Sequence, residues 1–291
     1  MNRKNHPSGV TLTEVLVSIF VMGIGLMSLL VLFPLGAMNM AQAIKDDRAA
    51  HAGANAAAIA RILNIRDDAM VFPAYTNPPP GAAALTPGGS SYPVYVDPIG
   101  VQISGGARLG GITRVSHSAI TTPTSTKRWL SLPDDINFGT NGRPANNPLE
   151  REVRYSWAYL CRQVEWQAPV GPGPWTSPQG VELTVVVYDG RPWLSDGGVP
   201  AGERTYAATF TKGQKTVTLT FGGAKPNIRK GMWILDATLN PTINGYFYRI
   251  ASAEQIGPTT MQLVLTKNAR ENGNVGVVMD YVVEVFEKGA N

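Results

Sequence analysis

The chain contains few of the residues that usually build disulfide frameworks and metal sites. Among its 291 residues there is one cysteine, Cys161, so no intrachain disulfide can form. Cys161 lies at the end of a predicted strand and is most simply interpreted as a small buried apolar residue. The three histidines, His6, His51 and His117, are far apart in sequence and have no neighbours at the spacing of a zinc site. We therefore expect neither a disulfide-stabilised fold nor a bound metal.

Common catalytic motifs are also missing from the sequence. There is no G-x-S-x-G nucleophile motif, and the glycines around Arg108 lack the Lys-Ser or Lys-Thr ending of a phosphate-binding loop. Residues 134–141 carry oxygen-bearing side chains that could bind calcium. They have neither the spacing of an EF-hand nor its closing Glu, so an ordinary polar loop is the better interpretation. We expect no enzyme activity and no cofactor.

Charged residues make up only 16% of the chain, and the formal net charge is +4. A basic balance is typical of proteins that bind nucleic acid when the cations gather on one face. Here the Lys and Arg residues are scattered along the sequence. A nucleic-acid partner is therefore not expected.

The longest stretch without any charge runs from Val15 to the residue before Lys45. About 20 apolar residues cross a hydrocarbon core of about 30 Å, so residues 15–37 are predicted to span a membrane. A secretory signal peptide is the alternative, but its apolar region usually has only about 7 to 15 residues and ends at an A-x-A-like site. Leu35, Gly36 and Ala37 place a bulky residue where that site needs a small one.

The charges near the N-terminus orient this span. Arg3 and Lys4 are the only charged residues before Glu14, and the positive-inside rule keeps that end in the cytoplasm. Glu14 itself is unusual, because a carboxylate within the apolar layer costs about 3 kcal/mol and normally has a partner. No Lys or Arg lies within helical reach on its C-terminal side. A position at the headgroup boundary is the simplest structural interpretation of Glu14.

The residues around Glu14 suggest a more specific role. The sequence GVTLTEVLV at residues 9–17 resembles the processing site of type IV pilins and type II secretion pseudopilins. The resemblance implies that prepilin peptidase cuts after Gly9 and that the new amine of Val10 is methylated. It identifies Glu14 as the assembly glutamate, whose charge the Val10 ammonium of a neighbouring subunit would neutralise in a low-dielectric bundle. Residues 23–29 look like the minor-pilin subclass, similar to minor pilin V and secretion pseudopilin I.

The resemblance also implies partners and a location. The expected partners are prepilin peptidase, other pilin or pseudopilin subunits and the inner-membrane assembly platform. The protein would cross the inner (cytoplasmic) membrane once, with its C-terminal domain outside the cytoplasm, and would enter a pilus or pseudopilus. In this arrangement residues 1–9 form a cytoplasmic leader peptide that is removed.

The membrane segment is predicted to continue as an amphipathic helix. Beyond Pro34 the chain is rich in alanine, and apolar residues recur at helical spacing, so one long helix is expected over residues 10–66. Pro34 should kink it, because the ring removes a backbone hydrogen bond and crowds the preceding turn. A proline that a membrane helix tolerates without a special role is the alternative.

The remaining sequence indicates a β-rich region. Residues 67–150 are rich in Pro and Gly and are predicted to form a variable loop region with a short strand at residues 92–96. Residues 151–291 form the predicted β-rich domain, and residues 201–277 are a candidate inserted β subdomain. Seven strand segments are expected there: 155–160, 182–188, 216–221, 232–237, 246–251, 261–266 and 280–286. The predicted fold class is α+β, with the long N-terminal helix packed on an antiparallel sheet, as in pilins, and an enlarged β-rich C-terminal region.

Two functions follow as hypotheses. The first is a structural subunit of a type IV pilus or a type II secretion pseudopilus, and a minor one, because a repeating subunit is usually more compact. The second is a single-pass membrane-anchored β-domain protein that binds a ligand outside the cytoplasm and does not polymerise. The mature N-terminus separates the two, because only the first requires a cut after Gly9.

Overall fold

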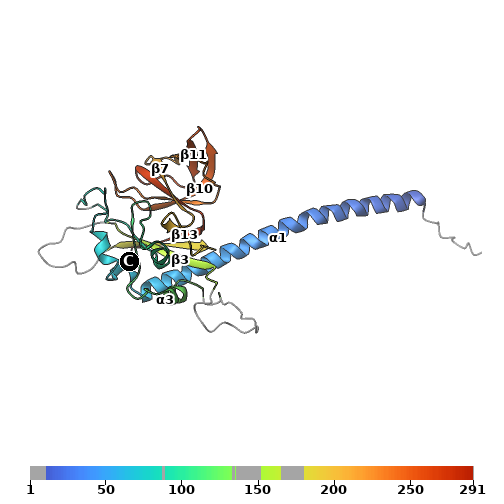
Figure 1. Cartoon of the computed structure of the whole chain (residues 1–291). Coiled ribbons are helices and arrows are strands. Elements are labelled where there is room, and N and C mark those ends of the chain that lie inside the picture. Colours follow the sequence, from blue (N-terminus) through green and yellow to red (C-terminus); the bar gives the residue numbers. More distant parts are fainter. Residues whose placement is uncertain (1–10, 87–88, 133–134, 136–151, 165–179, 291) are drawn as a thin grey trace, which may run out of the picture. The chain divides into compact units, whose positions relative to one another are not determined.

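The structure is a computed structural model of the whole chain, and it describes residues 11–86, 89–132, 135, 152–164 and 180–290 (Figure 1). The chain divides into two units, residues 1–48 and residues 49–291. The boundary lies inside the first helix. Each unit is described by itself below.

Helix α1 (Leu12–Ile62) has 51 residues and runs from the first unit into the second. It is the long helix that the apolar and alanine-rich sequence predicts. Its backbone stays helical through Pro34. Helix α1 ends before Asn64, which adopts a left-handed conformation with φ 48°, a conformation that commonly terminates helices and that Asn tolerates better than most residues.

A five-stranded sheet forms the centre of the second unit, with the strand order β13-β4-β3-β1-β2. Its strands are β1 (Val94–Val96), β2 (Thr113–Val115), β3 (Tyr155–Gln163), β4 (Val181–Asp189) and β13 (Val282–Ala290). The sheet is mixed rather than wholly antiparallel, because β1 and β2 are parallel. Parallel neighbours need a crossover connection, and here the connection contains helix α2 (Pro98–Ser104). The sequence analysis did not predict β2 or its direction.

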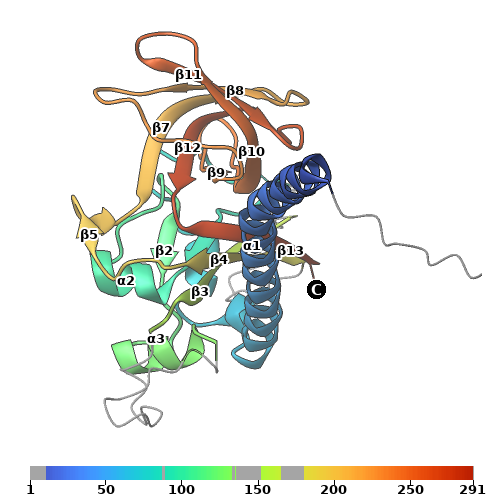
Figure 2. The same ribbon diagram turned by 90° about the vertical axis from the view of Figure 1, so that its right-hand side faces the viewer.

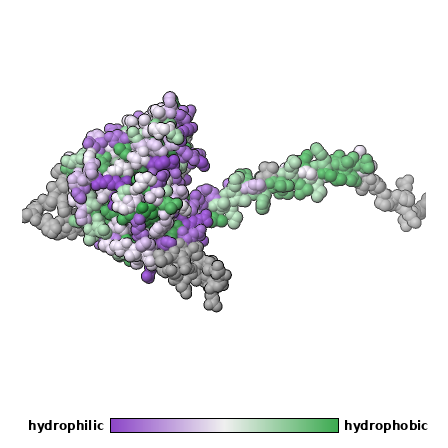
Figure 3. All heavy atoms as spheres, in the orientation of Figure 1, coloured by the Kyte–Doolittle hydropathy of each residue, from purple (hydrophilic) through white to green (hydrophobic). Residues whose placement is uncertain are grey.

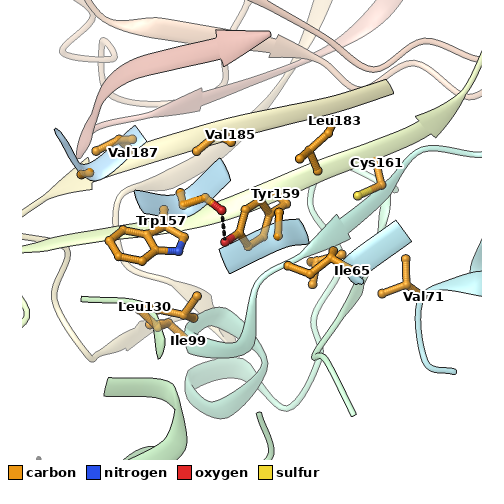
Figure 4. Packing of buried hydrophobic residues seen from close by; sticks show 14 of the residues in the cluster. Ile65, Val71, Ile99, Leu130, Trp157, Tyr159, Cys161, Leu183, Val185 and Val187 are labelled. Carbon is orange, nitrogen blue, oxygen red and sulfur yellow. Dashed lines mark hydrogen bonds between the residues drawn. The ribbon is translucent and has the colours of Figure 1, made fainter. Parts of the chain in front are cut away.

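One face of this sheet shares a hydrophobic core with the part of α1 that belongs to the second unit. Four alanines of α1 are buried in this core and follow one another at intervals of three or four residues: Ala49, Ala52, Ala56 and Ala60. Tyr159 of β3 donates a hydrogen bond from its hydroxyl to the carbonyl oxygen of Ala56, at 2.9 Å. Figure 4 shows Tyr159 beside Trp157 and Val185 in this core. Because alanine side chains are short, the helix backbone can lie close to the sheet.

The other face of the sheet packs against a closed six-stranded barrel with the strand order β10-β11-β8-β7-β12-β9 (Figure 2). Its strands are β7 (Glu203–Phe210), β8 (Thr216–Thr220), β9 (Trp233–Asp236), β10 (Tyr246–Gln255), β11 (Thr260–Leu265) and β12 (Gly273–Met279). Burial alternates along β8, where Val217 and Leu219 point inward. The second core lies between sheet and barrel and includes Leu160, Val186 and Val277.

Each of the seven strand segments expected after residue 151 overlaps a strand of the structure. Two barrel strands, β7 and β12, were not predicted. The outward positions of β7 include Ala207, and β12 begins at Gly273 and contains Gly276, so both strands carry residues with low β-propensity. Closing the barrel requires both strands, because β7 pairs with β8 and β12, and β12 pairs with β9.

The Pro/Gly-rich region before β3 has more regular structure than its composition indicates. Besides β1, β2 and α2 it holds helix α3 (Pro123–Trp129) and the 3₁₀ helix η2 (Phe72–Tyr75), which follows η1 (Ile65–Asp67). Between β4 and β7 lies a small hairpin, β5 (Ser195–Asp196) with β6 (Val199–Pro200).

Candidate functional site

The N-terminal end of α1 is closed by a reciprocal pair of hydrogen bonds between Thr11 and Glu14. The backbone N–H of Thr11 donates to Oε2 of Glu14 at 2.9 Å, and the Glu14 N–H donates to Oγ1 of Thr11 at 3.4 Å. The Thr11 hydroxyl also donates to the Glu14 carboxylate, at 3.1 Å. This is a capping box, which gives hydrogen-bond partners to backbone N–H groups that have none within the helix. Glu14 therefore has a partner within its own chain.

The sequence contained a direct signal for this contact. Thr11-Leu12-Thr13-Glu14 matches the pattern of a Thr followed three residues later by Glu at the start of an apolar helix. The sequence analysis considered only a charged partner for Glu14 and missed the cap. Gly9 and Val10 lie outside the described residues, so the cut after Gly9 and the methylation of Val10 stay predictions.

Most of the helix surface from Val15 to Met38 in the first unit is apolar. An 18-residue window of α1 has a mean hydropathy of 2.7 and is 0% buried, and among the described residues α1 is the one helix long and apolar enough to cross a membrane. Its large side chains are exposed, with Phe20 at 68% and Phe33 at 80%. The apolar character of this stretch is visible in Figure 3. Together with the sequence pattern, this surface indicates a membrane-anchored protein.

Polar side chains within this stretch bond to the helix itself. The Ser18 hydroxyl donates to the carbonyl oxygen of Glu14 at 2.7 Å, and the Ser28 hydroxyl donates to that of Ile24 at 3.0 Å. Such bonds to the preceding turn satisfy a hydroxyl without help from water or from another chain. The two serines therefore do not prevent the segment from lying in an apolar environment.

Three glycines of α1 have no packing role among the residues that the structure describes. A Cβ atom added to Gly23, Gly25 or Gly36 would meet nothing within 4 Å, whereas one added to Gly53 would lie 2.4 Å from the Phe286 ring. Only Gly53 is thus explained by an intrachain contact. Small residues in membrane helices allow a second helix to approach closely, so the first three are available for contacts with other subunits.

Pro34 lies within the apolar part of α1, ten residues before Ile44. Because proline has no backbone N–H, it cannot donate the usual helical hydrogen bond to the carbonyl of Leu30. The helix nevertheless continues on both sides. The kink at Pro34 stays a prediction.

A buried cluster of four charged side chains, which the sequence analysis missed, lies in the second unit. Arg191 binds both carboxylate oxygens of Asp97, each at 2.8 Å, and also contacts Glu203 at 2.9 Å. Arg114 pairs with Glu203 and lies 3.5 Å from Asp97. All four side chains are at most 6% exposed. Their sequence positions span more than 100 residues, so no local pattern brings them together.

The pKa shifts in this cluster follow from burial and mutual attraction. Burial by itself would raise the pKa of Asp97, but Arg191 and Arg114 hold it below its usual value. For Glu203 burial dominates over the attraction of the same two arginines, and its pKa is raised. Asp97 also accepts a hydrogen bond from the Gly100 N–H at the start of α2. The cluster therefore connects α2 and β2 to the segment that enters the barrel at β7.

Two other reactive side chains discussed for the sequence, those of His117 and Cys161, are buried in the second unit. Nε2 of His117 lies 2.9 Å from the carbonyl oxygen of Leu63 and 3.2 Å from Asp68, while its Nδ1 accepts from the Ala119 N–H. Cys161 is fully buried, and burial raises the pKa of its thiol to about 12. Within the described residues no group of three or more His, Cys, Asp or Glu side chains could hold a metal ion. Residues 134 and 136–141 of the calcium candidate lie outside the described part of the chain.

Comparisons with known proteins agree with the N-terminal pattern. The family model described as the prokaryotic N-terminal methylation motif matches residues 4–30. A search of curated proteins finds no match. Among solved structures, the phage phi92 endosialidase is similar over 46% of this chain, with 12% sequence identity and a TM-score of 0.19. The match spans only 18% of that protein and is too weak to support any argument about fold or function.

Proposed function

We propose that this chain is a minor structural subunit of a pilus or pseudopilus. Its N-terminal methylation motif supports membership of the type IV pilin and type II secretion pseudopilin family. The observation that carries the proposal is the coincidence of this motif with a long, exposed apolar helix. A family of structural subunits also agrees with the expectation that the protein is not an enzyme.

In the proposed pathway the precursor inserts in the inner membrane with residues 1–9 in the cytoplasm. Prepilin peptidase removes this leader after Gly9 and methylates Val10. The second unit then lies outside the cytoplasm, and an inner-membrane assembly platform moves the subunit from the bilayer into the fibre. The apolar surface of α1 suits both environments, because lipid tails and the helices of other subunits are equally apolar.

The fold of the second unit is consistent with a pilin-like core that carries an insertion. Strands β4 and β13 are neighbours in the sheet, and all barrel strands lie between them in the chain. The barrel thus occupies the connection between two adjacent antiparallel strands. We propose that it is an inserted subdomain, and that its bulk favours a minor role over that of the repeating subunit.

Glu14 is proposed to change its partner during assembly. In the single chain its carboxylate caps the helix through Thr11. In the fibre the methylated ammonium of Val10 from a neighbouring subunit would approach the Glu14 carboxylate. Each of these two charges is costly in an apolar environment, and the pair would compensate both. Capping and charge pairing can be separated by mutation, because Gln can cap a helix as Glu does but carries no charge.

The first experiment therefore compares Glu14→Gln with Thr11→Ala. Both variants should be processed and inserted in the membrane. Glu14→Gln should enter fibres at a level at least tenfold below the wild type, because the charge partner of Val10 is lost. Thr11→Ala keeps that charge and should enter fibres normally. Immunoblots of sheared fibre fractions against membrane fractions measure both. Normal incorporation of Glu14→Gln would contradict the proposed role of the charge.

The mature N-terminus tests the proposal independently. Mass spectrometry of the N-terminal peptide should find a chain that begins with a methylated Val10. An intact Met1, or a cut near Ala37, would contradict a pilin-type subunit. The first of these results would favour the alternative of a tethered β-domain protein that does not polymerise, and the second would indicate a secreted protein.

A further inference from the structure

A cleft lies between the barrel and strand β13, within the second unit. Its main cavity has a volume of about 320 Å³ and is lined by residues 247–249 of β10 and residues 285–288 of β13, together with Trp233 and Lys267. A second cavity of about 240 Å³ adjoins it and shares Phe247 and Glu287. No residue of this cleft belongs to the N-terminal motif or to α1.

The cavity runs along strand edges rather than along a sheet face. Successive side chains of a strand point to opposite faces, so a cavity lined by four consecutive residues of β13 lies beside its backbone. Among the described strands β13 pairs only with β4, which leaves its second edge without a strand. On the other side of the cleft, residues 246–249 of β10 pair with β9, and pairing with β11 begins only at Ile250. The Thr266 N–H extends this pairing by one residue, because it donates to the carbonyl oxygen of Arg249 at 2.9 Å. The second edge of β13 and the part of β10 before Arg249 thus border the same cavity.

Part of this edge is already covered by the barrel. The indole N–H of Trp233 donates to the carbonyl oxygen of Val283, at 3.4 Å. The groups further along β13 line the cavity instead. Exposed edge groups of this kind are the usual template for pairing with an additional strand.

The charges around the cleft have a positive excess. Arg249 lies 3.7 Å from Glu284, and Arg270 lies 2.7 Å from Glu287, so two ion pairs connect the barrel to β13. Their side chains are between 31% and 48% exposed, and exposed pairs of this kind are weak and exchangeable. Two further cations line the cavity, Lys267 and Lys288. Neither forms an ion pair within the described part of the chain.

We propose that this cleft binds an extended acidic segment of a partner polypeptide, which adds as a strand to the free edge of β13. Backbone hydrogen bonds to β13 would supply affinity, as in other cases of strand addition. Carboxylates of the segment would lie against Lys267 and Lys288, which gives a preference for acidic sequences. The proposal goes beyond the proposed function and does not depend on it, because it uses only residues of the second unit.

The test uses the full-length protein in detergent micelles and a fluorescein-labelled peptide, Thr-Asp-Val-Asp-Val-Asp-Thr. Fluorescence anisotropy should show saturable binding. The double variant Lys267→Glu/Lys288→Glu should weaken this binding at least tenfold. The matched control is Lys225→Glu/Lys230→Glu, which makes the same change of charge on exposed barrel lysines outside the cleft and should bind as the wild type does. Equal thermal unfolding of the variants would show that the fold is retained.

Two further probes test the binding mode. A peptide with N-methylated backbone amides should bind at least tenfold more weakly, because it cannot donate hydrogen bonds to the β13 edge. Polygalacturonate, an acidic polysaccharide without peptide groups, should not compete with the labelled peptide. The proposal is overturned if no saturable binding occurs up to millimolar peptide, if the control variant loses as much affinity as the cleft variant, if N-methylation has no effect, or if the polysaccharide competes.

Discussion

At the scale of single residues, Asp236 is the clearest case of a buried group that the fold tolerates at a cost. It is fully buried at the end of β9, and its carboxylate accepts hydrogen bonds from the N–H and hydroxyl of Thr238 and from the Asn244 amide. None of these donors carries a charge. Burial raises the pKa of Asp236 to about 6, although the hydrogen bonds act in the opposite direction.

This shift predicts a pH-dependent stability. The native carboxyl keeps its proton up to about pH 6, whereas the unfolded one loses it near its ordinary value of about 3.9. The contribution of Asp236 to the free energy of unfolding is therefore fully present below about pH 4. It is lost as the pH rises through about 6, which lowers the free energy of unfolding by up to about 3 kcal/mol. Urea unfolding of the wild type and of Asp236→Asn should show that the wild type loses stability relative to the variant over this range. Parallel pH profiles would exclude the effect.

At the scale of elements, the contact between α1 and the sheet depends on small side chains. Ala56 is 0% exposed and lies beneath β3, where its carbonyl oxygen accepts a hydrogen bond from the Tyr159 hydroxyl. Ala58, two residues further along the same helix, is exposed. The two positions share a helix and a residue type and differ in burial, so they separate packing from helix propensity.

Ala56→Leu should destabilise the second unit by about 1 to 3 kcal/mol, because the added carbons must enter a filled interface. Ala58→Leu should change its free energy of unfolding by less than about 0.5 kcal/mol. Chemical denaturation of the detergent-solubilised protein, followed by tryptophan fluorescence, measures both. If Ala56→Leu were as stable as Ala58→Leu, the close approach of helix and sheet would not be needed for stability.

At the scale of the whole second unit, the buried charge cluster connects the sheet region with the barrel. Asp97 directly follows β1, and Arg114 lies in β2. Arg191 follows β4, and Glu203 is the first residue of β7. The net charge of the four ionised side chains is zero, so each ion is compensated. Removing one charge leaves an unbalanced ion in a site that water does not reach.

Asp97→Asn should therefore cost about 3 to 5 kcal/mol of unfolding free energy, the range typical of a broken buried pair. The control is Asp280→Asn, because Asp280 pairs with Arg204 at an exposed site, 33% and 37% exposed respectively, and such pairs contribute at most about 1 kcal/mol. Urea unfolding of both variants supplies the comparison. A similar small loss for both would mean that the cluster does not hold the sheet and barrel together.

Features that depend on residues close together in the chain could be predicted from the amino-acid sequence. The charge-free run predicts the apolar helix, and segments rich in β-branched and aromatic residues between turn residues predict most strands of the second unit. The residues from Gly9 to Glu14 carry the family motif. The spacing of Thr11 and Glu14 also indicates a capping box, although only a charged partner was predicted for Glu14.

Features that depend on residues far apart in the chain follow from the packed fold and could not be predicted from local sequence patterns. The pairing of Asp97 with Arg191 joins positions 94 residues apart, and the parallel direction of β1 and β2 depends on how the chain crosses over. Strands β7 and β12 contain Ala207, Gly273 and Gly276, which have low β-propensity, and barrel closure supplies both strands with partners on two sides. Sequence patterns record the preferences of a segment, whereas charge pairing and strand order are set by the free energy of the whole packed unit.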